Sequence, residues 1–183
     1  MLFNTYLSAL ILNKMAIEAN KVVTLNYKLS NHKTGEKIEE TSPEHPMVFL
    51  FGTGAVIPEF EINLHGKNIG ETFEFSIESA NAYGNPNPNE IVQIPVDAFL
   101  DEDGNMETEY VYVGAVVPMN DEEGNQLTGT VLAITNTYVE MDFNHPLAGT
   151  DLKFEGEIVG IREATTEELA HGHAHGADGH AHH

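Results

Sequence analysis

Residues 54–70, GAVIPEFEINLHGKNIG, combine a glycine entry, a proline and closely spaced apolar residues. Pro58 suits the first position of a helix, because its missing N–H would be unpaired there anyway. Gly66 suits the end of the helix, because glycine tolerates a positive φ. The stretch therefore predicts one short amphipathic helix that plugs a curved sheet, with Ile62 and Leu64 seated in the sheet. Its apolar members are Val56, Ile57, Phe60, Ile62 and Leu64.

Alternating apolar and polar residues on both sides of this helix predict an antiparallel sheet. Residues 21–31 and 71–78 alternate strictly, and the second segment places Phe73, Phe75 and Ile77 inward. Shorter extended pieces are expected at 37–41 and 47–51. The chain ends its regular pattern with a long strand, which we expect to pair centrally with residues 21–31. One face of that strand is expected to carry Leu152, Phe154, Gly156, Ile158 and Gly160.

Residues 91–142 have their own strands and turns and predict an inserted domain. They follow ANAYGNPNPNE, where glycine, proline and asparagine forbid regular structure. The turn DEDGN faintly resembles a calcium loop, but its glycine falls too early and no bidentate glutamate follows, so a hairpin turn is favoured. The apolar residues expected to pack the insert are Phe99, Tyr110, Val113, Val116, Leu132 and Ile134.

The composition is strongly acidic, with 29 Asp and Glu against 8 Lys and Arg and a formal net charge of -21. Such a charge opposes nucleic acids and anionic membrane surfaces as partners. Cationic or polar polypeptides fit it better. The chain has no cysteine, which excludes disulfides, thiolate zinc sites and cysteine nucleophiles. Any metal must be held by His, Asp or Glu.

The first fourteen residues, MLFNTYLSALILNK, are apolar but lack a basic n-region and a small-residue cleavage site. The apolar run is also too short to span a membrane. Met15 is the better start, so we expect an over-long start annotation, with a weak signal or anchor segment as the alternative.

The C-terminal tail is low in complexity and rich in histidine, so we expect it to be disordered without a ligand. It follows a capping-box pattern, Thr165 to Glu168, which predicts a short surface helix. Imidazole suits nickel, copper and zinc, and the interspersed Gly, Ala and Asp argue against a purification tag. The candidate metal ligands are His171, His173, His175, His180, His182 and His183. The isolated histidines, expected to be surface or loop residues, are His32, His45, His65 and His145.

In chain order, GAVIPEFEINLHGKNIGE, ANAYG, an acidic β insert, NHPLAGTDLKFEGEIVGIREAT and the His-rich tail resemble an FKBP-type peptidyl-prolyl cis/trans isomerase of the SlyD kind. The resemblance implies an α+β fold, in which an antiparallel half-barrel sheet wraps a short helix and carries a small, mainly β insert-in-flap domain. The implied domains are an N-terminal extension (1–19), a discontinuous isomerase domain (20–90 and 143–164), the insert (91–142), and a short helix with the metal-binding tail (165–183).

The same resemblance implies a proline pocket formed by Tyr27, Glu39, Met47, Phe49, Val56, Ile57, Phe60, Tyr83 and Phe154. In it, the Tyr83 hydroxyl and the Ile57 backbone N–H would bind substrate carbonyls, and Glu39 would orient Tyr27 or favour the deformed carbonyl. From spacing alone, core packing is the favoured explanation of each apolar member. The resemblance reverses this preference for Tyr83, Ile57 and Phe154. Glu39, Met47 and Phe60 depart from the residues usual in the family, while Met47 and Phe60 keep the apolar character of their positions.

The function implied is an isomerase that needs no cofactor, joined to a chaperone insert that binds unfolded, proline-containing polypeptides. Its tail would bind Ni2+, or another divalent metal such as Zn2+ or Cu2+. The alternatives are a nickel-binding or metallochaperone protein, with nickel-enzyme maturation proteins as partners, and a holdase with little isomerase activity. We expect a cytoplasmic monomer that binds neither nucleic acid nor membrane.

Overall fold

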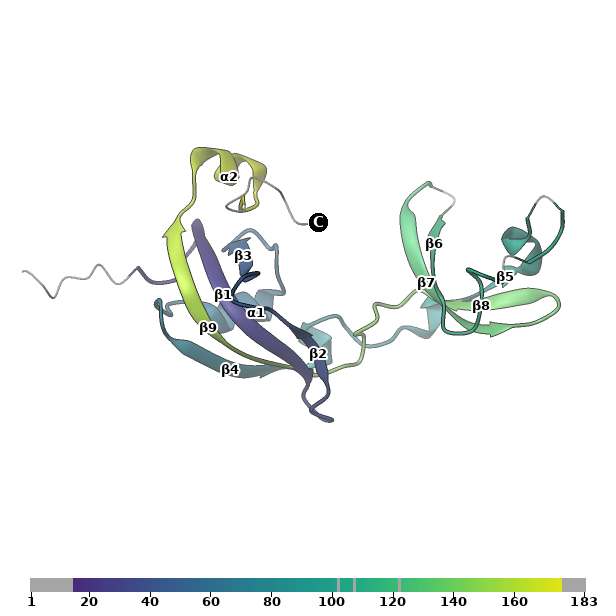
Figure 1. Cartoon of the computed structure of the whole chain (residues 1–183), viewed down its shortest axis with the longest axis horizontal. Helices are drawn as coiled ribbons and strands as arrows, with labels where there is room; N and C mark the ends of the chain where they lie inside the picture. Colours follow the sequence, from purple (N-terminus) through teal and green to yellow (C-terminus); the bar gives the residue numbers. More distant parts are fainter. Residues whose placement is uncertain (1–14, 102, 107, 122, 176–183) are drawn as a thin grey trace, which may run out of the picture. The chain divides into compact units, whose positions relative to one another are not determined.

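The computed structural model describes residues 15–101, 103–106, 108–121 and 123–175, which form two compact units (Figure 1). The first unit contains the chain up to Ala82 and from Thr150 onward, and the second runs from Tyr83 to Gly149. The expected insert, 91–142, lies inside the second unit, together with the connecting segments on either side of it. Within the described ranges, no helix has both the length and the apolar character needed to cross a membrane.

The first unit is an antiparallel sheet with one short helix against it. Its strands are β1 (Lys21–Asn31), β2 (Lys37–Glu40), β3 (Met47–Leu50), β4 (Thr72–Ile77) and β9 (Leu152–Glu163). The strand order is β2-β1-β9-β4, and β3 also pairs with β1. The expected central pairing of the first and last strands is confirmed, since β1 and β9 pair along their lengths (Figure 1). The first unit has the mixed α+β architecture that the sequence predicted.

A β-bulge in the β1–β9 pairing changes which residues of β9 face the core. The register shifts between Thr24 and Leu25, so that Thr24 pairs with Gly160 and Leu25 pairs with Ile158. The extra residue moves Gly160 off the face that it was expected to share with Ile158. Ile161, opposite Val23, is buried in its place.

Helix α1 (Pro58–Leu64) begins at the predicted proline, and Gly66 follows it with a φ of 79°. It buries Phe60 and Leu64, which are four residues apart and share one face. Ile62 is 66% exposed, so the expectation that it seats the helix in the sheet is wrong. The reason is geometric, since two residues rotate the side chain by about 200° around the helix axis.

The residues just before β1 belong to the fold of the first unit. Ile17 is fully buried, its N–H donates to the Lys67 carbonyl, and its own carbonyl accepts from the Gly66 N–H. Ile17 falls within the expected N-terminal extension, 1–19, and is a core residue that closes the end of α1. Residues 1–14, where the question of the start was raised, lie outside the described residues.

The second unit is a four-stranded antiparallel sheet of order β5-β8-β7-β6. Its strands are β5 (Ile91–Pro95), β6 (Val116–Asn120), β7 (Gln126–Ile134) and β8 (Tyr138–Asp142). Short 3-10 turns lie at η1 (Ser79–Asn81) in the first unit and at η2 (Pro88–Glu90) and η3 (Val96–Phe99) in the second. The core of the second unit consists of Phe99, Val111, Ala115, Val131, Val139 and Met141.

Four of the residues expected to pack the insert are exposed. Tyr110, Val113 and Val116 are 63%, 62% and 64% exposed, and Leu132 is 40% exposed. Phe99 is buried as predicted, and Ile134 is partly buried. For Tyr110 and Val113 the expectation fails because the chain before β6 forms turns rather than a strand, so alternation does not decide which side chains point inward. Leu132 lies where the pairing of β7 with β8 shifts register, between Val131 and Ala133. Val116 begins β6 on the exposed side.

The two chain segments that lead into and out of the second unit's sheet are hydrogen-bonded to each other. The Gly149 N–H donates to the Gly84 carbonyl at 2.7 Å, and the Phe143 N–H donates to the Glu90 carbonyl at 2.9 Å. Between these two bonds, the Asn87 N–H donates to Asn144 Oδ1 at 2.7 Å. We call this pair of segments, 84–90 and 143–149, the neck.

The turns of the insert are built by aspartate. Asp101 Oδ1 accepts from the N–H groups of Asp103 and Asn105, and Asp121 Oδ1 does the same for Glu123 and Asn125. The carboxylate of Asp101 therefore closes its own turn, as the hairpin-turn interpretation of DEDGN predicted.

Candidate functional site

An aromatic cluster covers the concave face of the first unit, and Phe60 of α1 is at its centre. The Phe60 ring lies 4.8 Å from Phe154 and 5.6 Å from Phe75, measured between ring centroids. It lies 6.2 Å from Phe49 and 6.5 Å from Tyr27. Tyr27, Phe49, Phe60 and Phe154, which were predicted as site residues, are thus brought together. We call this group, with Phe73 and Phe75, the aromatic cluster.

Strand register explains why these side chains meet. Phe154 of β9 pairs with Leu29 of β1 on one side and with Phe75 of β4 on the other. Cross-strand partners point to the same face of a sheet, so three strands aim aromatic or apolar groups at α1. Phe73 and Phe75 were not predicted as site residues, although their alternation had placed them inward. The pairing of Phe75 with Phe154 is the relationship that brings them to the site.

A glycine of β9 leaves room for the Phe73 ring and for the neighbouring strand β1. Gly156 pairs with Tyr27 of β1 and with Phe73 of β4. A Cβ atom added there would lie 2.6 Å from Phe73 Cζ and 2.2 Å from the Asn26 carbonyl oxygen. Both distances are far below van der Waals contact. Glycine is therefore required at this position by close approach, because no side chain fits between the neighbouring strands.

The N-terminus of α1 offers a backbone donor beside this cluster. Ile57 is the residue before the helix, with φ −53°, and its carbonyl accepts from the N–H groups of Phe60 and Glu61. Its own N–H has no hydrogen-bond partner among the described residues. Val56 and Ile57 are both half-buried. One turn of helix thus carries the buried Phe60 ring and, just before it, an available N–H.

The remaining predicted members of the first unit lie on β2 and β3. Met47 pairs with Leu25 and is half-buried, and Phe49 pairs with Val23 and is buried. Glu39 pairs with Leu29 and is exposed. Register places all three on the concave face, since Leu25, Val23 and Leu29 belong to it.

Tyr83 lies in the second unit, where it is 39% exposed. Its ring stacks on that of His145, with centroids 3.8 Å apart and an interplanar angle of 3°. His145 Nδ1 accepts from the Leu147 N–H at 3.1 Å, which fixes the orientation of the imidazole. His145 is exposed, as expected of an isolated histidine, but its contact with Tyr83 was not foreseen, because the two residues are far apart in the sequence.

Three of the predicted metal ligands converge at the end of the described chain. One ring nitrogen from each of His171, His173 and His175 lies within 4.8 Å of the other two. This donor set fits a borderline metal ion such as nickel, copper or zinc. The other three candidates, His180, His182 and His183, lie outside the described residues.

Helix α2 (Thr166–His171) precedes this cluster and carries the predicted capping box. The Thr165 hydroxyl accepts from the Glu168 N–H, and the Glu168 carboxylate accepts from the Thr165 N–H. Arg162 also donates two hydrogen bonds to this carboxylate. These bonds, with those from the backbone N–H groups of Thr165 and His175, hold the pKa of Glu168 well below its usual range. Burial alone would raise that pKa. The helix is therefore tied to the end of β9 and is not merely a surface helix.

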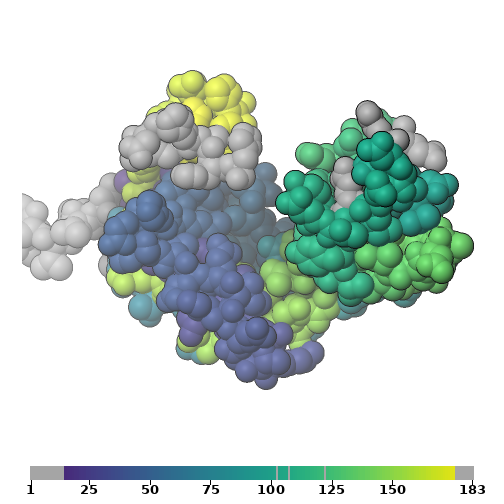
Figure 2. Space-filling model, turned by 45° about the vertical axis from the view of Figure 1, so that its right-hand side comes forward, coloured from purple at the N-terminus to yellow at the C-terminus, as the bar shows by residue number. Residues whose placement is uncertain are grey.

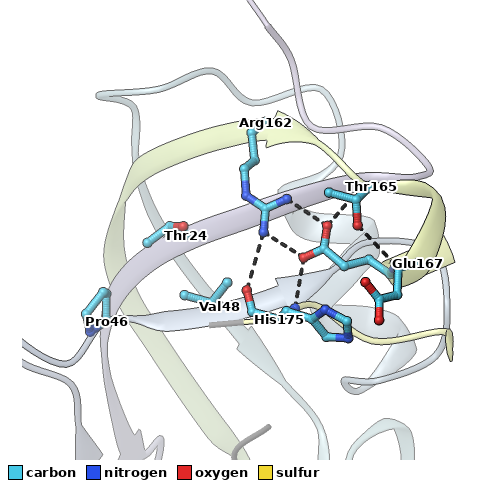
Figure 3. Close-up of a pocket in the computed structure, with 8 residues that line it drawn as sticks. Thr24, Pro46, Val48, Arg162, Thr165, Glu167 and His175 are labelled. Atoms are coloured by element: carbon cyan, nitrogen blue, oxygen red, sulfur yellow. Dashed lines mark hydrogen bonds and ion pairs between the residues drawn. The ribbon is translucent and has the colours of Figure 1, made fainter. Parts of the chain in front are cut away.

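Two of the hollows in the first unit are lined by residues outside the aromatic cluster. One, of about 530 Å3, lies between the outer face of the sheet and α2, and includes Thr24, Val48 and Arg162 in its lining (Figure 3). The other, of about 420 Å3, lies beside α1, next to Phe51, Ile62 and His65.

Comparison with known proteins agrees with this geometry. A family model described as FKBP-type peptidyl-prolyl cis-trans isomerase matches residues 13–101. The SlyD isomerase of Aeromonas hydrophila is 38% identical over 168 residues, which cover 92% of this chain and 75% of that protein. The SlyD isomerase of Escherichia coli (strain K12) is 34% identical over 163 residues, covering 89% and 79%. The chain therefore belongs to the FKBP-type peptidyl-prolyl cis-trans isomerases.

Within that family, the similarity is to the SlyD kind, as the sequence predicted. A probable 16 kDa FKBP-type isomerase of Pseudomonas fluorescens is 34% identical over 152 residues, covering 83% of this chain and 96% of that protein. Among solved structures, FkpA from Escherichia coli aligns with a TM-score of 0.42 and 15% identity, over 82% of this chain and 44% of that one.

Proposed function

We propose that the first unit accelerates cis/trans isomerisation of X-Pro bonds by holding the prolyl ring against the aromatic cluster. The observation that carries this proposal is the position of Phe60 in α1. Its ring contacts aromatic side chains from β1, β3, β4 and β9. The Ile57 N–H, which has no partner among the residues that the structure describes, lies three residues before it. An apolar surface beside one oriented donor suits a proline and the carbonyl next to it.

Isomerisation breaks no bond, so the site needs neither a nucleophile nor a cofactor. The barrier is about 18–20 kcal/mol, because the amide loses its partial double-bond character as it twists. The twisted amide has less charge separation than the planar one, so an apolar surface favours the transition state over the ground state. Each gain of about 1.4 kcal/mol is a tenfold gain in rate.

Polar groups would set which torsion turns. The Ile57 N–H would donate to the carbonyl beside the proline, and the Tyr83 hydroxyl would donate to a second substrate carbonyl. Glu39, on the concave face by register, would orient Tyr27 or favour the deformed carbonyl. Val56 and Met47 would complete the apolar rim.

A backbone substitution tests the role of the Ile57 N–H directly. Ile57→Pro removes the N–H, and a φ of −53° is compatible with proline. Ile57→Ala, the matched control, removes the side chain but keeps the N–H. We expect Ile57→Pro to lower kcat/KM for an X-Pro peptide about tenfold below Ile57→Ala, the size expected for one transition-state hydrogen bond.

Circular dichroism should first show that both variants are folded. If Ile57→Pro and Ile57→Ala then have equal activity, the Ile57 N–H takes no part in catalysis. Catalysis by the wild-type chain of a proline-limited refolding reaction is the accompanying test of the activity itself.

We propose that the second unit binds unfolded chains and passes them to the isomerase unit. Supporting this, its turns before β6 expose apolar side chains, with Tyr110, Tyr112 and Val113 being 63%, 56% and 62% exposed. Figure 2 shows this part of the chain at the surface of the second unit. β6 is also an edge strand, whose free edge suits pairing with an extended polypeptide.

Replacing exposed side chains tests this binding surface. Tyr110→Ser with Val113→Ser should weaken binding of a permanently unfolded protein while leaving turnover of a short X-Pro peptide unchanged. Ile62→Ser is the matched control, because Ile62 is equally exposed but lies in the first unit. Unchanged binding by the double variant would place the client surface elsewhere.

We propose, finally, that the tail binds Ni2+, or Zn2+ or Cu2+, through His171, His173 and His175, with His180, His182 and His183 as further ligands. The convergence of three imidazoles supports this. A nickel-binding role with nickel-enzyme maturation proteins as partners is the alternative main function. Truncation after Ala170 should abolish nickel binding and leave isomerisation intact, whereas Tyr83→Ala with Phe154→Ala should do the reverse. The cytoplasmic location and monomeric state stay predictions.

A further inference from the structure

Glu168 is buried to an unusual degree for a charged side chain. It is 1% exposed, and it is the one charged residue among the buried polar residues of the described chain. Four donor groups surround its carboxylate. Arg162 donates to Oε2 at 2.8 Å and to Oε1 at 2.6 Å, while the Thr165 N–H reaches Oε2 and the His175 N–H reaches Oε1, each at 2.8 Å. Burying a carboxylate is tolerated only with such complete pairing.

The bond to His175 goes beyond what a capping box requires. A capping box closes the first turn of a helix and uses one carboxylate oxygen on the N-cap N–H. Here the second oxygen holds a main-chain N–H seven residues further along the chain. Arg162 Nη2 also donates to the His175 carbonyl, at 3.4 Å. The His175 N–H is therefore bound by Glu168, and the His175 carbonyl is bound by Arg162.

The chain reaches this point by reversing at the end of α2. Gly172 has the left-handed conformation, with φ 74°, and its N–H donates to the Glu168 carbonyl at 2.8 Å. This turn brings His173 and His175 back towards His171. The ring centroids of the three histidines are 5.2 to 5.7 Å apart.

Holding His175 reduces the entropic cost of assembling the three imidazoles. Fixing one residue of a free chain costs about 1–2 kcal/mol in backbone entropy. A flexible His-x-His-x-His segment would bear this cost at each residue when it binds a metal. In this chain, the Glu168 contact places the last of the three before any ion arrives.

We infer that the Arg162–Glu168 pair is the positioning element of the tail's three-histidine site, which it preassembles by holding the His175 backbone. The inference rests on the proposed metal binding and adds to it the part of the fold that organises the ligands. Because Arg162 is in β9, the site is anchored to the central strand of the first unit rather than to the tail alone.

The first test measures Ni2+ binding by isothermal titration calorimetry in the full chain with His180→Ala, His182→Ala and His183→Ala. In this background we expect one Ni2+ per chain, and Glu168→Gln should weaken its affinity about tenfold or more, as loss of a group that orients metal ligands does. Glu167→Gln is the matched control, because Glu167 is an exposed neighbour in the same helix with the same charge. Its affinity should stay within about twofold of the background.

Equal affinities of Glu168→Gln and Glu167→Gln would overturn the positioning role while leaving metal binding standing. Absence of Ni2+ binding in the three-histidine background would overturn the metal site itself.

The second test needs no metal and no variant that risks unfolding. Amide hydrogen exchange of the metal-free wild-type chain should show protection of the His175 N–H, comparable with that of the Thr165 N–H, which donates to the same carboxylate. Exchange of His175 at the rate of an unfolded peptide, with Thr165 protected, would show that the site is not preassembled and would overturn the inference.

Discussion

Phe60 of α1 and Phe154 of β9 meet edge to face, with ring centroids 4.8 Å apart and planes inclined at 61°. This contact joins the helix to the sheet at the surface where the proline would bind. Phe154→Leu keeps an apolar side chain but removes the ring, so we expect kcat/KM for an X-Pro peptide to fall about tenfold, or about 1.4 kcal/mol. The measurement is a protease-free peptide isomerisation assay.

Phe51→Leu is the control for that substitution. Phe51 is also buried, but its ring neighbours are Phe49 and His65, beside α1. Both variants should lose about 1 kcal/mol of unfolding free energy, while only Phe154→Leu loses activity. Equal losses of activity would mean that the aromatic cluster acts through stability alone.

Gly156 is expected to be intolerant of any side chain. Gly156→Ala would place its Cβ 2.2 Å from the Asn26 carbonyl oxygen, so the strands must separate, at a cost of about 2–3 kcal/mol in unfolding free energy. Gly160→Ala is the matched control in the same strand, since its Cβ would lie 3.4 Å from Thr24 Cβ. Urea unfolding should find Gly160→Ala within about 1 kcal/mol of wild type, and similar costs at both positions would contradict the steric argument.

The Tyr83 ring stacks on His145, whereas its hydroxyl is the proposed donor to the substrate, so a substitution can test the two roles separately. Tyr83→Phe keeps the flat ring that His145 contacts and removes only the O–H, so we expect kcat to fall about tenfold with unchanged stability. Tyr110→Phe, on an exposed tyrosine of the same unit, should leave kcat unchanged. Full activity of Tyr83→Phe would exclude its hydroxyl as a donor to the substrate.

Asp151 should make the stability of the first unit depend on pH. Its carboxylate accepts from the Ser79 N–H at 2.9 Å and pairs with Lys33 at 2.9 Å, and these contacts lower its pKa below the usual value. A carboxyl with a lowered folded-state pKa contributes stability above its unfolded-state pKa of about 3.9, and loses it as pH falls through the folded-state value. Asp151→Asn should therefore be less stable than wild type at pH 7, with the difference shrinking below about pH 4.

Urea unfolding at pH 7 and at pH 3 measures that difference. If the difference in unfolding free energy between Asp151→Asn and wild type were the same at pH 7 and pH 3, the loss of stability would come from altered packing and not from the missing charge.

The elements of the first unit were predictable because their signals are local. Pro58 and Gly66 delimit α1 within a few residues, and alternation alone identifies β1 and β4. The bulge opposite Thr24 was not predictable, because it arises from the pairing of β1 with β9 and not from either strand. The exposure of Ile62, by contrast, follows from the helical period and was open to prediction.

Several residues of the candidate site could be predicted from the sequence, but the contacts between them could not. The resemblance supplied Phe60 and Phe154, but the contribution of Phe75 depends on register with β9. The capping box at Thr165 and Glu168 was visible in the sequence. The burial of Glu168 by Arg162 and the His175 backbone was not, since it requires the chain to reverse at Gly172.

The hydrogen-bonded neck bears on the order in which the chain folds. β4 and β9 pair across everything between Ile77 and Leu152, and the entropy lost in closing such a loop grows with the logarithm of its length. When the second unit folds first, the bond between Gly149 and Gly84 already brings its two ends together. The loop left to close is then a few residues long, a saving of about 2 kcal/mol. By this reasoning, early folding of the second unit assists folding of the first unit, because it lowers the entropy cost of pairing β4 with β9.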